Sequence, residues 1–219
     1  SEFVARGWSL KQLHRTLLLS ATYRQSSAIE ADRAAADPEN RLYGRMNRLR
    51  LEGEAIRDSL LVIGGQLNPK AGGPGVFPPI PKELFEGAKG WVVSADAREH
   101  DRRSLYIFAR RNLRFPFLEV FDAPDNNLSC SGRERSTTAP QSLTLLNADE
   151  VLRASEQAAV RIEKENTDTA TRIAAAYRTI LGRAPSATER DLSVTFLERS
   201  PLRELCRALF NLNAFIYLD

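Results

Sequence analysis

Apolar side chains recur every three to four positions through most of the chain, a spacing typical of amphipathic helices. The clearest stripes lie in residues 10–21, 56–63, 151–162, 173–181 and 202–213. Gly182 follows one stripe as a stop, and Ser186 with Glu189 forms a capping box ahead of a further helix, marked by Leu192 and Phe196. The pattern predicts a mainly α, irregular helical domain of about six to eight helices, with at most a small two-stranded β-ribbon.

Cap and breaker residues divide the N-terminal part of the chain. Residues 1–7 are typical of the tail of a helix that begins before Ser1, so we expect an N-terminally truncated piece of a longer protein. The capping box of Ser9 and Gln12 predicts a helix of about 14 residues with a buried leucine face. Residues 22–36 are predicted to form a loop with a partial turn, and Asp37 followed by Pro38 predicts the start of another helix.

A second long helix is predicted over residues 49–63, with Ile56 and Leu60 on its buried face and Gly64 at its end. Charged residues, Arg57 among them, cover its other faces. Two interpretations of these charges stay open. They are either solvated, or they form a buried Arg/Glu network that holds the central segment of the chain.

Glycine and proline are concentrated in residues 64–90, which contain seven of the twelve glycines and five of the eleven prolines. Such a composition predicts a long loop, and its apolar residues predict that the loop lies over the core or acts as a lid. The short apolar run of residues 104–108 predicts a strand, and residues 91–93 are predicted to pair with it. The whole of residues 1–219 is expected to be one domain.

Charged and apolar residues are most tightly mixed in residues 102–147, where a site is expected. Its arginines offer planar donors suited to carboxylate, sulfate or phosphate, and the helix that starts near Pro140 favours anions at its N-terminus. The candidate ligand-binding residues are Arg111, Asn112, Asp122, Asn126, Arg133, Arg135, Thr138, Gln141 and Asn147. Arg133 and Arg135 point the same way in an extended segment, so they form either an anion clamp or structural ion pairs. Phe115 and Phe117 could stack on sugar rings.

Charge, apolar run length and cysteine spacing argue against three classes of function: nucleic-acid binding, membrane spanning, and metal or cofactor binding. The net charge is +3 over 219 residues, and because acidic residues are interspersed with the arginines, a nucleic-acid interface is not expected. The chain contains no run of about 18 apolar residues, so no membrane span is predicted. Cys130 and Cys206 match neither zinc-site nor haem-attachment spacing, so no metal or cofactor is predicted in this chain.

An enzymatic interpretation has candidate groups but no recognised catalytic spacing. The central carboxylates Glu119, Asp122, Asp125 and Glu134 could act as acid and base, but the sequence does not show their separations. His14 is expected to be structural and His100 to be exposed to solvent. Cys130 is expected to be buried and inert, although the nearby arginines could make it reactive.

Several segments together resemble a known family. They include SEFVARGWSLKQLHRTLLLSATYRQSS, RLEGEAIRDSLL, RRSLYIFARRN, FDAPDNN, GRERSTTAPQSLTLLN, AYRTILGRAPSATE and LFNLNAFIYLD. The chain is similar throughout to the planctomycete-specific C-terminal domain of unknown function. The resemblance implies a parent protein that is exported to the periplasm or cell surface and carries a cytochrome-c-like domain elsewhere, where haem c would be bound.

These observations favour a non-catalytic binding or scaffold module. Its partners would be other domains of the parent chain, including the cytochrome-c-like domain, or an anionic polysaccharide. The alternative is a hydrolase or a redox-linked enzyme that uses the central carboxylates.

Overall fold

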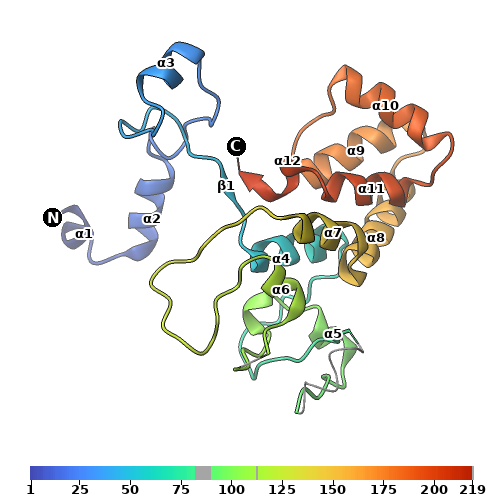
Figure 1. Cartoon of the computed structure of the whole chain (residues 1–219), viewed down its shortest axis with the longest axis horizontal. Helices are drawn as coiled ribbons and strands as arrows, with labels where there is room; N and C mark the ends of the chain where they lie inside the picture. The colour runs from blue at the N-terminus through green and yellow to red at the C-terminus, as the bar shows by residue number, and fades with distance from the viewer. Residues whose placement is uncertain (82–89, 112, 219) are drawn as a thin grey trace. The chain divides into compact units, whose positions relative to one another are not determined.

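The structure, a computed structural model, describes residues 1–81, 90–111 and 113–218. Its described residues contain twelve α-helices, a 3₁₀-helix and one antiparallel pair of two-residue strands (Figure 1). The prediction of a mainly α fold with a small ribbon is confirmed. The helices outnumber the predicted six to eight because several, such as α1 (Glu2–Ala5), are a single turn that leaves little periodic signal. The chain divides into two compact units, Ser1–Arg50 with Tyr217–Asp219, and Leu51–Ile216.

The first unit contains α1, α2 (Leu10–Leu18), α3 (Ala31–Ala36) and the strands β1 (Leu49–Arg50) and β2 (Tyr217–Leu218). The capping box prediction for α2 is confirmed in part, because Ser9 Oγ accepts a hydrogen bond from the backbone N–H of Gln12 at 3.3 Å. The predicted loop over residues 22–36 is wrong in its second half, where α3 lies. The helix predicted to start at Asp37 is also wrong, since Asp37 instead ends α3.

The carboxylate of Asp37 explains that second difference. It accepts the backbone N–H groups of Arg41 at 2.9 Å and Leu42 at 2.8 Å, which closes a turn after the helix. These bonds to the ionised form lower its pKa. An Asp ahead of Pro is compatible with either a cap or a turn, so the sequence alone did not decide between them.

The second unit is organised around α8 (Asp149–Glu165). It packs against α11 (Leu202–Phe210), α4 (Gly53–Ile63), α9 (Thr169–Leu181) and α7 (Ala139–Asn147), which lie above α8 and to its left in Figure 1. Large side chains that are fully buried come from all of these helices: Ile56, Leu60, Leu145, Val151, Ile173, Leu209 and Phe210. Helix α10 (Ala187–Leu197) and α12 (Asn213–Ile216) complete the C-terminal part.

The C-terminal caps follow the sequence closely. Gly182 ends α9 with φ of 70°, and Ser186 and Glu189 form the predicted capping box of α10. Cys206 lies in the core stripe of α11, where burial raises its thiol pKa to about 12. Leu192 and Phe196 do mark α10 but are exposed, so the buried face of that helix is not the one they define.

The glycine- and proline-rich segment lies over the core where it is described. Val76 and Ile80 are buried, and the Arg102 guanidinium donates to the backbone carbonyls of Lys70 and Gly72, which fastens the loop. The remainder of the predicted loop, residues 82–89, lies outside the described residues, and no lid is assigned.

The predicted pairing of residues 91–93 with residues 104–108 is wrong. Residues Ser104–Tyr106 form the 3₁₀-helix η2, and Val76 makes an isolated bridge with Ile107 instead. The short α5 (Ala97–His100) precedes η2, and α6 (Pro116–Val120) follows it. The observed ribbon instead pairs Leu49 with Leu218 and Arg50 with Tyr217. Within the described residues, no helix has both the length and the apolar character needed to cross a membrane.

Candidate functional site

A cleft of about 930 Å³ lies in the second unit, where three segments that are far apart in sequence meet. Residues 78–81 form one wall, the start of α6 forms the second, and the junction between α7 and α8 forms the third. The apolar lining consists of Pro78, Pro79, Ile80, Pro81, Phe115, Pro116, Phe117, Val120, Ala148 and Leu152. The polar lining consists of Arg57, His100, Thr144, Asn147, Asp149, Glu150 and Arg153. Its volume and mostly apolar lining are those of a small-ligand site.

Arg57 of α4 lies at the base of the cleft and is only 1% exposed. Its guanidinium donates to the carbonyl oxygens of Arg102 at 3.1 Å and His100 at 2.6 Å, and to Ser104 Oγ at 3.3 Å. Burial lowers its pKa, an effect that nearby carboxylates, Glu150 first, partly offset. Arg57 therefore does not belong to a solvated face, and it holds residues 100–104 against α4. This agrees with the buried role of the second interpretation, but the acceptors are carbonyl and hydroxyl oxygens and not glutamates.

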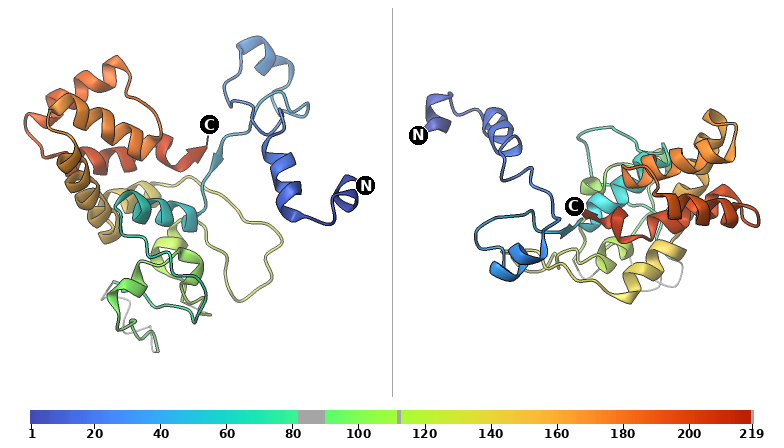
Figure 2. Two further views of the ribbon diagram at one scale, coloured as in Figure 1. Left: turned by 180° about the vertical axis from the view of Figure 1, so that it is seen from behind. Right: turned by 90° about the horizontal axis from the view of Figure 1, so that it is seen from above.

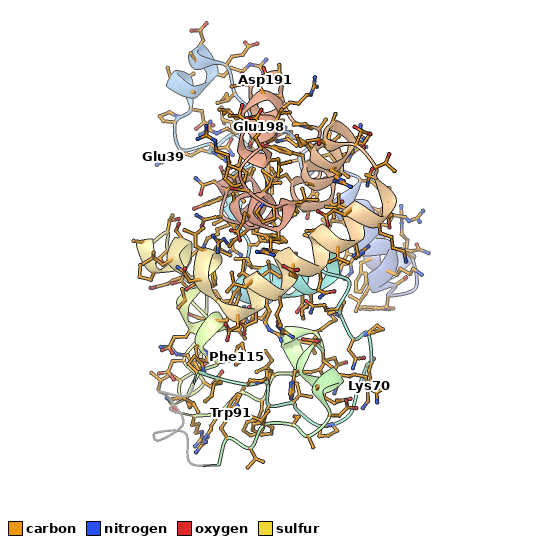
Figure 3. The ribbon with its side chains drawn as sticks, turned by 90° about the vertical axis from the view of Figure 1, so that its right-hand side faces the viewer. Glu39, Lys70, Trp91, Phe115, Asp191 and Glu198 are labelled. Atoms are coloured by element: carbon orange, nitrogen blue, oxygen red, sulfur yellow. The ribbon has the colours of Figure 1, made fainter. Side chains whose placement is uncertain are left out.

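Phe115 lines the cleft beside Arg57, and the buried Trp91 packs against Phe115. The Phe115 ring lies 5.7 Å from the Arg57 guanidinium carbon and stacks on Trp91 with ring centroids 6.4 Å apart (Figure 3). Phe117 is buried against Phe121. The rings of Phe115 and Phe117 are thus engaged within the protein, so the suggested stacking of sugars on their faces is not supported by their burial.

His100 lines the cleft and is half-buried, so the expectation that it is exposed to solvent is wrong. Its Nε2 lies 2.7 Å from the carbonyl oxygen of Ser94. Because a carbonyl oxygen only accepts, Nε2 carries the proton, and Nδ1 of the neutral ring is the acceptor. His100 can therefore offer a hydrogen-bond acceptor to a ligand.

The junction of α7 and α8 supplies the polar end of the cleft. Ala148 is the N-cap of α8, so Asn147 and Asp149 lie on either side of the cap. Asn147 lines the cleft and donates from Nδ2 to the carbonyl of Leu143 at 2.9 Å. The two cationic lining residues, Arg57 and Arg153, balance the two anionic ones, Asp149 and Glu150, so the lining has no formal net charge with His100 neutral.

Four residues of the central stretch form a polar cluster at the two ends of the loop between α6 and α7. We call Asp122, Ser136, Thr138 and Gln141 the loop latch. Asp122 accepts from the Ser136 N–H and from Ser136 Oγ, both at 2.8 Å, and Gln141 Nε2 donates to Ser136 Oγ at 3.2 Å. Thr138 and Gln141 form the capping box of α7. The predicted site residues Asp122, Thr138 and Gln141 therefore lie together, outside the cleft.

Arg133 and Arg135 form ion pairs with the start of α4. Arg133 Nη1 lies 2.7 Å from Glu52 Oε2 and 2.9 Å from Glu54 Oε2, and Arg135 Nη2 lies 3.3 Å from Glu52 Oε1. The bond to Glu54 is the main cause of a raised Arg133 pKa. These arginines are thus paired with carboxylates of the same chain, but the Arg133 side chain is 36% exposed, so the pairs are not the buried ones that the structural interpretation expected.

The other candidates are dispersed. Arg111 and Asn126 are exposed, and Asn112 lies outside the described residues. Glu119 pairs with Arg114, and Asp125 accepts from the Asn127 N–H at 2.8 Å. None of the described central carboxylates lines the cleft. Cys130 is exposed, so the expectation that it is buried is wrong.

A second pocket, of about 450 Å³, has several charged lining residues that are paired with one another. Lys70 pairs with Glu99 at 2.7 Å and Arg98 with Asp96 at 2.9 Å. These bonds lower the pKa of both carboxylates. No group of three or more potential metal ligands occurs in the described part of the chain. The apolar cleft is accordingly the better candidate site.

Sequence reasoning missed most of this cleft. Of the predicted site residues only Asn147 lines it, and Arg57 was the signal that could have led there, because an arginine one position after Ile56 and three before Leu60 lies near a core stripe.

Comparison with known proteins identifies a family but no close characterised relative. No curated protein and no solved structure matches the chain. Residues 1–197 match the model of PSD1, described as a protein of unknown function (DUF1553). Because this match covers most of the 219 residues, the chain belongs to the PSD1 family of proteins of unknown function (DUF1553).

Proposed function

We propose that the chain is a non-catalytic binding module and that the cleft between residues 78–81, α6 and the α7–α8 junction holds its ligand. The observation that carries this proposal is the cleft of about 930 Å³ with mainly apolar walls. Among its described lining residues the only hydroxyl group is that of Thr144, and there is no thiol. The lining therefore suits recognition better than nucleophilic catalysis.

The ligand we propose is predominantly apolar and carries little net charge. Proline, isoleucine and leucine side chains would cover its apolar part, while His100, Asn147 and the balanced charges at the start of α8 would orient its polar groups. A group presented by a neighbouring domain of the parent chain, such as the cytochrome-c-like domain, fits this lining better than an anionic polysaccharide. The glutamate pairing of Arg133 and Arg135 further weakens the case for the polysaccharide. Export of the parent protein is part of this proposal.

Thermal-shift screening of the intact chain tests the proposal. One arm uses neutral apolar and aromatic alcohols, and the other uses sulfated and uronic-acid glycans. We expect stabilisation in the first arm, lost in Leu152→Arg at the cleft mouth and kept in Leu143→Arg, an exposed α7 position outside the lining. Stabilisation by glycans that survives Leu152→Arg would argue against the cleft. Turnover of a glycan that disappears in Asp122→Asn would favour the hydrolase alternative.

A further inference from the structure

The N-terminal helices of the first unit carry an apolar surface with no buried side chain. Seven large residues there, which we call the α1–α2 face, are each at least half exposed: Val4, Trp8, Leu10, Leu17, Leu18, Leu19 and Tyr23. The sequence predicted a buried leucine face for this helix, and that prediction is wrong. Scattered apolar residues on a surface need no explanation, but seven within residues 4–23 mark an interaction surface.

Helix α2 is amphipathic, with one cation at the edge of its leucine stripe and one on its polar side. At 3.6 residues per turn, Leu10, Leu13 and Leu17 lie on one side, Lys11 lies at the flank, and Arg15 lies on the opposite side. Trp8 precedes the helix and touches Phe3 edge-on, with ring centroids 5.3 Å apart. Aromatic residues thus lie at both ends of the leucine stripe, Trp8 before it and Tyr23 after it.

The charge around the α1–α2 face has one sign. Residues 3–29 contain no Asp or Glu, and the nearest acid, Glu2, is paired with Arg6. Lys11, Arg15 and Arg24 complete the cationic set. A second copy of the chain on this face would bring these cations together, whereas an anionic partner would be attracted.

We propose that the α1–α2 face lies on an anionic lipid surface, with its leucines in the acyl boundary and Lys11 and Arg15 among the headgroups. A leucine stripe, Lys and Arg at its edge and on the polar side, and aromatic residues at the interface are the features of helices that lie in the membrane plane. Such a helix does not span the bilayer, in keeping with the absence of a spanning helix among the described residues.

Vesicle co-sedimentation of the intact chain tests this proposal. We expect binding to vesicles of equal parts phosphatidylglycerol and phosphatidylcholine, weak binding to phosphatidylcholine alone, and loss of binding as salt is raised. Each cation near an anionic surface contributes about fivefold to partitioning, so Lys11→Gln with Arg15→Gln should weaken binding by about 25-fold. Leu17→Glu should abolish it, whereas Leu192→Glu, at an exposed leucine of α10, should leave it unchanged.

Trp8 provides an independent readout, because Trp91 is buried. In the free chain, acrylamide should quench the fluorescence of Trp8, which is the component that Trp8→Phe removes. Vesicles should shift the Trp8 emission to the blue and protect it from acrylamide. Three results would overturn the proposal. The first is protection of Trp8 from acrylamide without vesicles, and the second is vesicle binding that survives Leu17→Glu. The third is a chain that sediments as a dimer and does not bind vesicles. Circular dichroism of each variant is the control, since a variant that keeps the wild-type helical spectrum has lost vesicle binding and not its fold.

Discussion

Arg57 and Arg133 differ in burial and in bonding partners, and we expect them to contribute differently to stability. Arg57 is buried and serves three neutral acceptors in residues 100–104. Its removal leaves those acceptors without a donor, so Arg57→Ala should lower the free energy of unfolding by about 3 kcal/mol or more. Urea denaturation measures this. Arg153→Ala, at an exposed position, is the control, with an expected cost below about 1 kcal/mol. Equal losses in both variants would contradict the account.

Arg133 gives the complementary prediction. Its pairs with Glu52 and Glu54 are partly exposed, so solvent screens them and leaves both glutamates hydrated when the arginine is removed. Arg133→Ala should therefore cost about 1 kcal/mol or less in the same urea measurement. A loss of about 3–5 kcal/mol, the range for a broken buried pair, would mean that the loop is packed more tightly than the structure shows.

At the scale of the element, the capping box of α10 predicts a pH dependence. Arg183 donates to both carboxylate oxygens of Glu189 at 2.7 Å, and with the Ser186 N–H it lowers the Glu189 pKa from the usual 4.5 to about 2. As the pH falls, Glu189 therefore becomes protonated in the unfolded state before it does in the folded state. The stability contributed by Glu189 is complete above about pH 4.5 and is lost as the pH falls toward 2. Acid denaturation followed by circular dichroism should be less steep in Glu189→Gln than in wild type, and unchanged in Glu198→Gln.

The loop latch predicts where the chain opens. Residues 121–138 leave α6 and return to α7 as a long loop, visible from behind in Figure 2. Asp122 holds the C-terminal segment of this loop through its hydrogen bonds to Ser136. Its φ is positive, at 63°, a conformation that Asp and Asn tolerate. Asp122→Ala should speed cleavage within residues 123–135 by limited proteolysis, while Asp122→Asn should retain partial protection. Equal cleavage of wild type and Asp122→Ala would show that the latch does not hold the loop.

The long helices could be predicted from local signals in the sequence, whereas a short local signal such as Asp37 followed by Pro38 was ambiguous and the long-range contacts could not be predicted. The stripes of α8, α9 and α11 and the stop at Gly182 depend on neighbouring residues alone, so they could be predicted. The one-turn helices and η2 leave too few residues for a period to appear. The exposure of α2 could not be predicted either, because periodicity identifies an apolar face but not what covers it.

At the scale of the whole molecule, the cleft depends on tertiary structure. Its walls come from residues 78–81, α6 and the α7–α8 junction, and Arg57 and His100 reach it from two further elements. A continuous motif cannot encode such a site. The search therefore settled on residues 102–147, which hold the loop latch and surface ion pairs as well as part of the cleft lining. Among the candidate ligand-binding residues of that stretch, only Asn147 lines the cleft.

Methyl NMR with a small apolar probe tests the central claim, ligand binding in the cleft, most directly. Benzyl alcohol titrated into the intact, methyl-labelled chain should cause saturable shifts of the Ile80, Val120 and Leu152 methyl signals, which report from all three walls. In Leu152→Arg the shifts of Ile80 and Val120 should vanish, and in Leu143→Arg they should persist. If the cleft methyls do not respond, or if their shifts never saturate while those of the exposed leucines of α2 do, the cleft is not the binding site.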